Sequence, residues 1–163
     1  MSTQDTFSAD EWAAIIGAPM LAGSFIAISD PGITSLVGET SAMMKAITSG
    51  EVPAGASDLV NSIIASFKEM AESKEKLEMP DITDEKDPAA AKAALLADVK
   101  KAVDSVAAKG SADEAAGYKQ WIMSVANATA EAAKEGGFMG IGGTRVSDQE
   151  KAALAELGAT MGV

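Results

Sequence analysis

The clearest structural signal in the chain lies in residues 87–132, which read DPAAAKAALLADVKKAVDSVAAKGSADEAAGYKQWIMSVANATAEA. Steps of three and four residues separate the apolar residues Leu96, Val99, Val103 and Val106, as on one face of an α-helix. The same spacing returns after Gly110, at Tyr118, Ile122, Val125, Thr129 and Ala132. Two helical faces joined by so short a turn predict an antiparallel αα-hairpin over residues 88–135.

Serine residues mark three expected helix starts, one of them inside this hairpin. In each case a carboxylate follows three residues later, which is the pattern of a capping box. The pairs are Ser8 with Glu11, Ser111 with Glu114, and Ser147 with Glu150.

Proline and glycine residues mark further boundaries. Asp30-Pro31 and Asp87-Pro88 each place a capping aspartate before a proline at the first helical position. Gly110 and the pair at 136–137 are expected to end helices. Pro19 lacks an N–H group and crowds the preceding turn, so we expect a kink or break in the first helix near residues 17–19.

These signals predict an all-α fold, with residues 1–163 forming a single-domain bundle of about six helices. No alternating β-type pattern of useful length is present. We expect the uncharged N-terminal helices at the centre of the bundle, with the charged helix and the hairpin around them. The expected segments are apolar N-terminal helices at about 9–49, a charged helix at about 57–79, a linker at 80–87, the hairpin at 88–135, a glycine-rich loop at 136–146 and a terminal helix at 147–161.

Composition excludes many kinds of function. The chain has no histidine and no cysteine, so catalytic triads with histidine, thiol nucleophiles, zinc fingers and disulfides are excluded. A net charge of −11, with Arg145 as the single arginine, argues against nucleic-acid binding, which needs clustered basic residues. No cofactor and no metal site is expected. Tyr118, Lys119 and the carboxylates remain as acids or bases, but no sequence pattern pairs them.

The most distinctive segment for binding is the glycine-rich stretch before the last helix. Its glycines free the backbone to turn amides toward a ligand, and an arginine and a capped helix start follow. The candidate anion-binding residues are Gly140, Gly142, Gly143, Thr144, Arg145 and Ser147. The stretch lacks the Gly-Lys-Ser/Thr of a phosphate-binding P-loop, and the alternative is a crossover loop in which Arg145 pairs with a surface carboxylate.

Other polar and apolar clusters have ordinary structural explanations. The carboxylates Glu69, Glu72, Glu75 and Glu78 do not share one helix face, so they indicate a solvated, salt-bridged surface. The acidic stretch at 81–87 lacks the glycine and the final glutamate of a calcium loop. The methionines, together with Trp12 and Trp121, suit either core packing or a partner-binding surface, and core packing is the favoured interpretation.

An uncharged stretch from Trp12 to Ser29 is near the lower limit for a membrane-spanning helix. Acidic residues precede it, there is no basic segment of a secretion signal, and Gly17 and Pro19 dilute its hydrophobicity. We therefore expect a buried helix and a cytoplasmic protein. Reversible membrane association of residues 12–38 is a weaker alternative.

The C-terminal segment GGFMGIGGTRVSDQEKAALAELGATMG, residues 136–162, resembles an uncharacterised group of small bacterial helical proteins. Their ends carry a similar glycine-rich stretch followed by Val-Ser and an alanine-rich helix. The Trp-Ala-Ala…Ala-Pro pattern of the first helix is a second point of likeness. The resemblance implies a bacterial cytoplasmic protein, and it implies no activity.

The sequence as a whole favours a small acidic binding or interaction protein without catalytic activity. A homodimer through an alanine- and methionine-rich face is one form that such an interaction would take. The alternative from another class is a small-anion or phosphometabolite site at the glycine-rich loop and Arg145.

Overall fold

The computed structural model describes residues 2–30, 36–73, 87–132 and 146–163, and within these ranges it contains helices and no strand. The predicted all-α bundle is confirmed. The elements are η1 (Gln4–Thr6), α1 (Ala9–Ala27), α2 (Leu36–Ser49), η2 (Ala54–Ala56), α3 (Ser57–Ser73), α4 (Pro88–Lys109), α5 (Ala112–Ala132) and α6 (Asp148–Met161).

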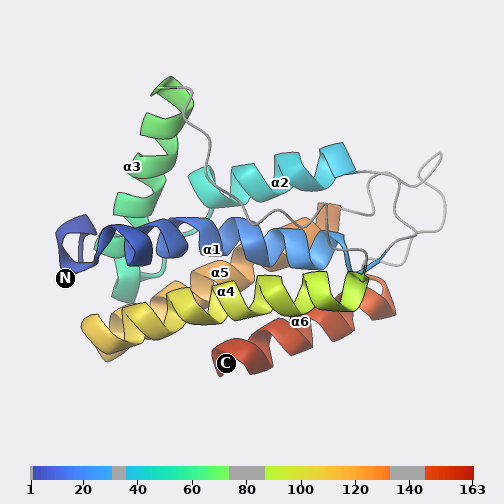
Figure 1. Ribbon diagram of the computed structural model, residues 1–163. Helices are drawn as coiled ribbons and strands as arrows, with labels where there is room; N and C mark the ends of the chain where they lie inside the picture. Colours follow the sequence, from blue (N-terminus) through green and yellow to red (C-terminus); the bar gives the residue numbers. More distant parts are fainter. Residues whose placement is uncertain (1, 31–35, 74–86, 133–145) are drawn as a thin grey trace.

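Helices α1 and α5 are at the centre of the bundle. In Figure 1, α1 runs between α2 on one side and α4 on the other, and α6 lies along the α4–α5 hairpin. Helix α3 rises away from the other helices (Figure 1). The prediction that both N-terminal helices lie at the centre is therefore correct for α1 and wrong for α2. Helix α2 packs mainly against α5 and lies at the edge of the bundle.

The predicted helix starts are present where the structure describes them. At each capping box the serine Oγ accepts a hydrogen bond from the glutamate N–H, and a glutamate oxygen accepts one from the serine N–H, at 2.7–3.3 Å. Asp87 caps α4 by accepting from the N–H of Ala89 at 3.0 Å, and Gly110 ends that helix. The expected start at Asp30-Pro31 and the end of the third helix beyond Ser73 lie outside the described residues.

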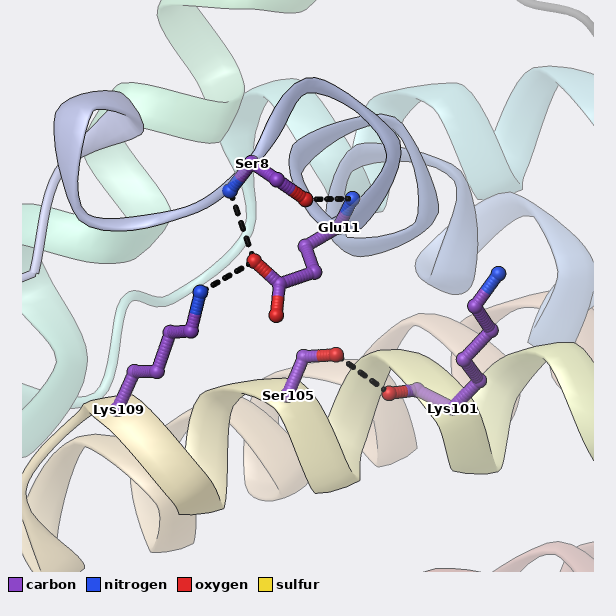
Figure 2. A network of polar contacts seen from close by, with 5 residues as sticks. All are labelled: Ser8, Glu11, Lys101, Ser105 and Lys109. Atoms are coloured by element: carbon purple, nitrogen blue, oxygen red, sulfur yellow. Dashed lines mark hydrogen bonds and ion pairs between the residues drawn. The ribbon is translucent and has the colours of Figure 1, made fainter.

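The Ser8 capping box also ties α1 to α4. The Oε2 atom of Glu11 accepts hydrogen bonds from the Ser8 N–H and from Lys109 Nζ at the end of α4, as Figure 2 shows. Lys109, followed by the N–H of Ser8, lowers the pKa of Glu11. The ion pair therefore holds the first turn of α1 against the last turn of α4.

Glu114 connects the N-terminal segment to the hairpin turn. Its carboxylate accepts from the N–H of Ser111 and from both the N–H and the hydroxyl of Ser2, and its side chain is buried. Burial by itself raises the pKa of Glu114, but the hydrogen bonds from Ser111 and Ser2 outweigh it, so the pKa is lowered. The hydrogen bonds from Ser111 and Ser2 therefore favour the ionised form of the Glu114 carboxylate.

Helix α1 continues through Pro19, so of the expected kink or break the break is absent. Proline has no N–H, and the carbonyl of Ile15, four residues earlier, therefore lacks its helical donor. The hydroxyl of Tyr118 on α5 supplies the missing hydrogen bond to this carbonyl at 2.7 Å. Burial raises the pKa of Tyr118, so the hydroxyl keeps the proton that it donates.

The core fills the space between these helices with a few large side chains. Trp12 and Trp121 are 6% and 0% exposed, which confirms the core interpretation of both. Elsewhere backbones approach closely. A Cβ atom on Gly117 of α5 would lie 2.9 Å from the N atom of Ala56 in η2, a distance that real Cβ contacts do not show.

Candidate functional site

A small cavity of about 160 Å³ lies where α1, α2 and α5 meet. Its size is close to that of engineered apolar cavities that take up benzene, which hold about 150 Å³. Most of the wall is apolar, with one carboxyl group and three hydroxyl groups. The lining residues are Gly23, Ser24, Ala27 and Ile28 of the α1 end, Glu39, Thr40 and Met43 of α2, and Thr129 of α5.

Two features of the helices shape this cavity. Gly23 has no side chain, and a Cβ atom at this position would overlap the Sδ atom of Met43. The glycine therefore lets α1 and α2 approach each other while Met43 lies across the space. On the α5 side, the Thr129 hydroxyl donates to the carbonyl of Val125 at 2.9 Å. Its Oγ1 can therefore only accept a hydrogen bond from a molecule in the cavity.

Glu39 is the unusual group in the cavity wall. Glu39 is 3% exposed, and its Oε2 atom has no hydrogen-bond partner among the described residues. Burial raises the pKa of Glu39, and the negative charges of Glu150 and Asp30 raise it further. A buried carboxyl oxygen without a partner is rare in native proteins, because it loses its water without a replacement.

Replacing Glu39 with glutamine should stabilise the protein at neutral pH. The pKa of Glu39 in the folded state is raised above its ordinary value of 4.5. The protonated carboxyl group therefore contributes its full stability below pH 4.5, and this contribution is lost as the pH rises through the folded-state pKa. Glutamine is neutral throughout. We expect Glu39→Gln to gain about 1 kcal/mol in urea unfolding at pH 7.5 and little at pH 4.

A matched control is Glu69→Gln, which removes the same charge from an exposed position on α3. It should leave the free energy of unfolding unchanged within about 0.5 kcal/mol at both pH values. A Glu39→Gln protein that is less stable than the wild type at pH 7.5 would show that the carboxylate is held by a favourable interaction.

The predicted anion site is described only at its last member. Gly140, Gly142, Gly143, Thr144 and Arg145 lie outside the described residues. Ser147 caps α6: its N–H donates to the carboxylate of Glu150, a residue that is 2% exposed, and its Oγ accepts from the N–H of Glu150. The anion site therefore stays a prediction, and its one described residue is already occupied by an internal capping contact.

The other candidate residues do not come together as a site. Tyr118 uses its hydroxyl to hold α1, as described above, and Glu69 and Glu72 are exposed on α3. Glu75, Glu78 and residues 81–86 lie outside the described residues. Within the described ranges no three acidic residues are grouped so as to hold a metal ion.

The uncharged stretch at 12–29 forms most of α1, and its large side chains Trp12, Ile15 and Phe25 are buried in the bundle. Of the helices in the described part of the chain, none has both the length and the apolar character needed to cross a bilayer.

Sequence reasoning did not find Glu39. A signal for it is present, because Glu39 is the one formally charged residue between Asp30 and Lys45. The isolated carboxylate marks the position as unusual, although acidic side chains are almost never fully buried without a partner. The pattern nevertheless gives no indication of the cavity, which depends on residues from three helices.

Comparison of the chain with protein-family models, with curated proteins and with solved structures finds no match. The resemblance of residues 136–162 to small bacterial helical proteins therefore stays a prediction. Any statement about function rests on the site itself.

Proposed function

We propose that this chain is a non-catalytic binding protein and that its ligand is a small, largely apolar molecule held in the cavity between α1, α2 and α5. The observation that carries this proposal is Glu39, which lines this largely apolar cavity and whose buried Oε2 atom has no hydrogen-bond partner among the described residues. Leaving such an atom unpaired costs about 1–3 kcal/mol. A ligand that donates a hydrogen bond to it would recover this free energy.

The composition of the cavity supports binding rather than catalysis. Proton-transfer chemistry needs an acid or base placed beside a nucleophile or a second titratable group. Among the described residues that line the cavity, Glu39 is the one titratable group, and the other polar groups are hydroxyls. The cavity can therefore orient a ligand, and its described wall offers no second titratable group to pair with Glu39.

The described surface also favours a small ligand over a protein partner. Protein interfaces are centred on exposed large apolar residues. In the ranges that the structure describes, Val163 is the one large apolar residue that is exposed, at 61%. The methionines at 20, 43, 44, 70, 123 and 161 are buried or half-buried. In this part of the chain, the apolar side chains that would form a protein interface are packed inside the bundle.

The size of the cavity sets the expected affinity. A volume of about 160 Å³ admits about six non-hydrogen atoms, as benzene does in a cavity of similar size. Very small ligands rarely exceed about −1.5 kcal/mol per atom, and Kd values between about 10 μM and 1 mM are realistic. The test therefore needs probes at millimolar concentration.

A direct test is to fill the cavity from its rim. Ala27 is half-buried and lines the cavity, and leucine at this position is compatible with the helix. Benzene and 1-pentanol should shift the NMR signals of the Met43 and Ala27 methyl groups saturably in the wild type. The Ala27→Leu variant should lose about tenfold or more in affinity for both probes.

The matched control is Ala13→Leu, which adds the same side chain to an exposed position of the same helix. It should bind both probes like the wild type. The proposal fails if no probe shifts the cavity methyl groups saturably, or if Ala27→Leu binds as the wild type does while it remains folded by circular dichroism.

A further inference from the structure

We infer that the ligand of the α1–α2–α5 cavity carries a primary ammonium group on a short apolar chain of about four or five carbons. This inference rests on the proposed function and adds the chemical class of the ligand. Its evidence is the combination of a largely apolar wall, a buried carboxyl oxygen that has no partner among the described residues, and two further acidic residues that act on this carboxyl group.

Two polar groups of the cavity wall can accept hydrogen bonds from a ligand. Among the described residues Glu39 Oε2 has no donor, and Thr129 Oγ1 can only accept, because its proton goes to the carbonyl of Val125. A ligand that satisfies both groups must bring at least two donors. A primary ammonium has three N–H donors, an alcohol has one, and an ether or a carboxylate has none.

The negative charge around Glu39 favours a positively charged hydrogen-bond donor over a neutral one. Glu150, at the start of α6, and Asp30, after the end of α1, both act on Glu39, and both are acidic. Among the described residues no lysine or arginine contributes to the charge felt by Glu39. A cation in the cavity would therefore be attracted by three carboxyl groups, and an anion would be repelled by them.

The apolar part of the wall limits the rest of the ligand. Ala27, Ile28 and Met43 offer only apolar atoms, and the volume leaves no room for a second hydrated group. Inorganic cations lose too much hydration in such surroundings, and no three acidic residues of the described chain are grouped to replace their water. An alkylammonium places its charge at Glu39 and its chain against these residues.

The experiment compares three probes of equal length: pentylamine, 1-pentanol and pentanoate. Binding to the full chain is followed at pH 7.5 by the methyl signals of Met43 and Ala27. We expect pentylamine to bind at least about tenfold more tightly than 1-pentanol, as a hydrogen bond to a charged group predicts, and pentanoate to bind weakest.

The variant that isolates the charge is Glu39→Gln, with the exposed Glu69→Gln as the matched control. Glu39→Gln should lower the affinity for pentylamine about tenfold and keep that for 1-pentanol within about threefold. Glu69→Gln should change neither, which excludes an effect of net charge alone.

The possible results separate this inference from the proposed function. If none of the three probes binds, both fail. If 1-pentanol binds as tightly as pentylamine, or if Glu39→Gln keeps the preference for the amine, the ammonium inference is overturned and the binding cavity stands. Tightest binding of pentanoate would also overturn it, and would indicate an anion site in its place.

Discussion

Replacement of Tyr118 with phenylalanine should lower the free energy of unfolding by about 2 kcal/mol. The change removes one oxygen atom, yet it leaves the carbonyl of Ile15 without a donor in a fully buried part of α1. The carbonyl cannot recover a helical bond, because Pro19 stands at the position that would supply the N–H. Urea unfolding at neutral pH measures the loss directly.

A double-mutant cycle with Pro19→Ala tests the reason for this loss. Alanine at 19 restores an N–H group four residues after Ile15. In that background Tyr118→Phe should cost less than half as much, giving a coupling energy of about 1–2 kcal/mol. A coupling energy below about 0.3 kcal/mol would show that the tyrosine hydroxyl does not replace the missing helical bond.

A Gly117→Ala substitution should lower the free energy of unfolding by about 3 kcal/mol. Its Cβ would lie 2.8 Å from Ala56 Cβ and 2.9 Å from Ala56 N, so part of the backbone must move. A flexible side chain could turn away from such a contact, but a backbone N atom cannot. Thermal or urea unfolding of the variant provides the measurement.

The control for this variant is Gly158→Ala in α6. There the new Cβ would meet the carbonyl oxygen of the exposed residue Val163 at 3.3 Å, a contact that a small shift relieves. Alanine also favours the helix over glycine, so the variant should be neutral or up to about 1 kcal/mol more stable than the wild type. Similar losses for both substitutions would contradict the close packing of η2 on α5 as the cause.

The helix boundaries could be predicted because their signals are local. Ser8, Ser111 and Ser147 each act on an amide three residues away, and Asp87-Pro88 sets the first turn of α4 without help from another element. The apolar spacing of the hairpin likewise depends on one helix at a time. These contacts form in the same way whatever the rest of the bundle does.

The features that the sequence does not reveal depend on residues far apart in the chain. The continuity of α1 depends on a hydroxyl that is 103 residues away, and no rule about Pro19 anticipates it. The burial of Glu39 and the cavity around it depend on three helices meeting. The order of the helices in space likewise depends on contacts between residues far apart in the chain. For this reason α2 was expected at the centre, whereas it lies at the edge.

The contact between Ser2 and Glu114 also has a consequence for the kinetics of folding. Its two residues are 112 positions apart, and in the folded bundle α1, which follows Ser2, packs on both helices of the α4–α5 hairpin. We expect a contact of such long range to form after the main transition state of folding, because closing so long a loop costs entropy that other contacts must first offset. It therefore adds little to the rate at which the chain folds and acts mainly by slowing the rate at which the assembled bundle comes apart.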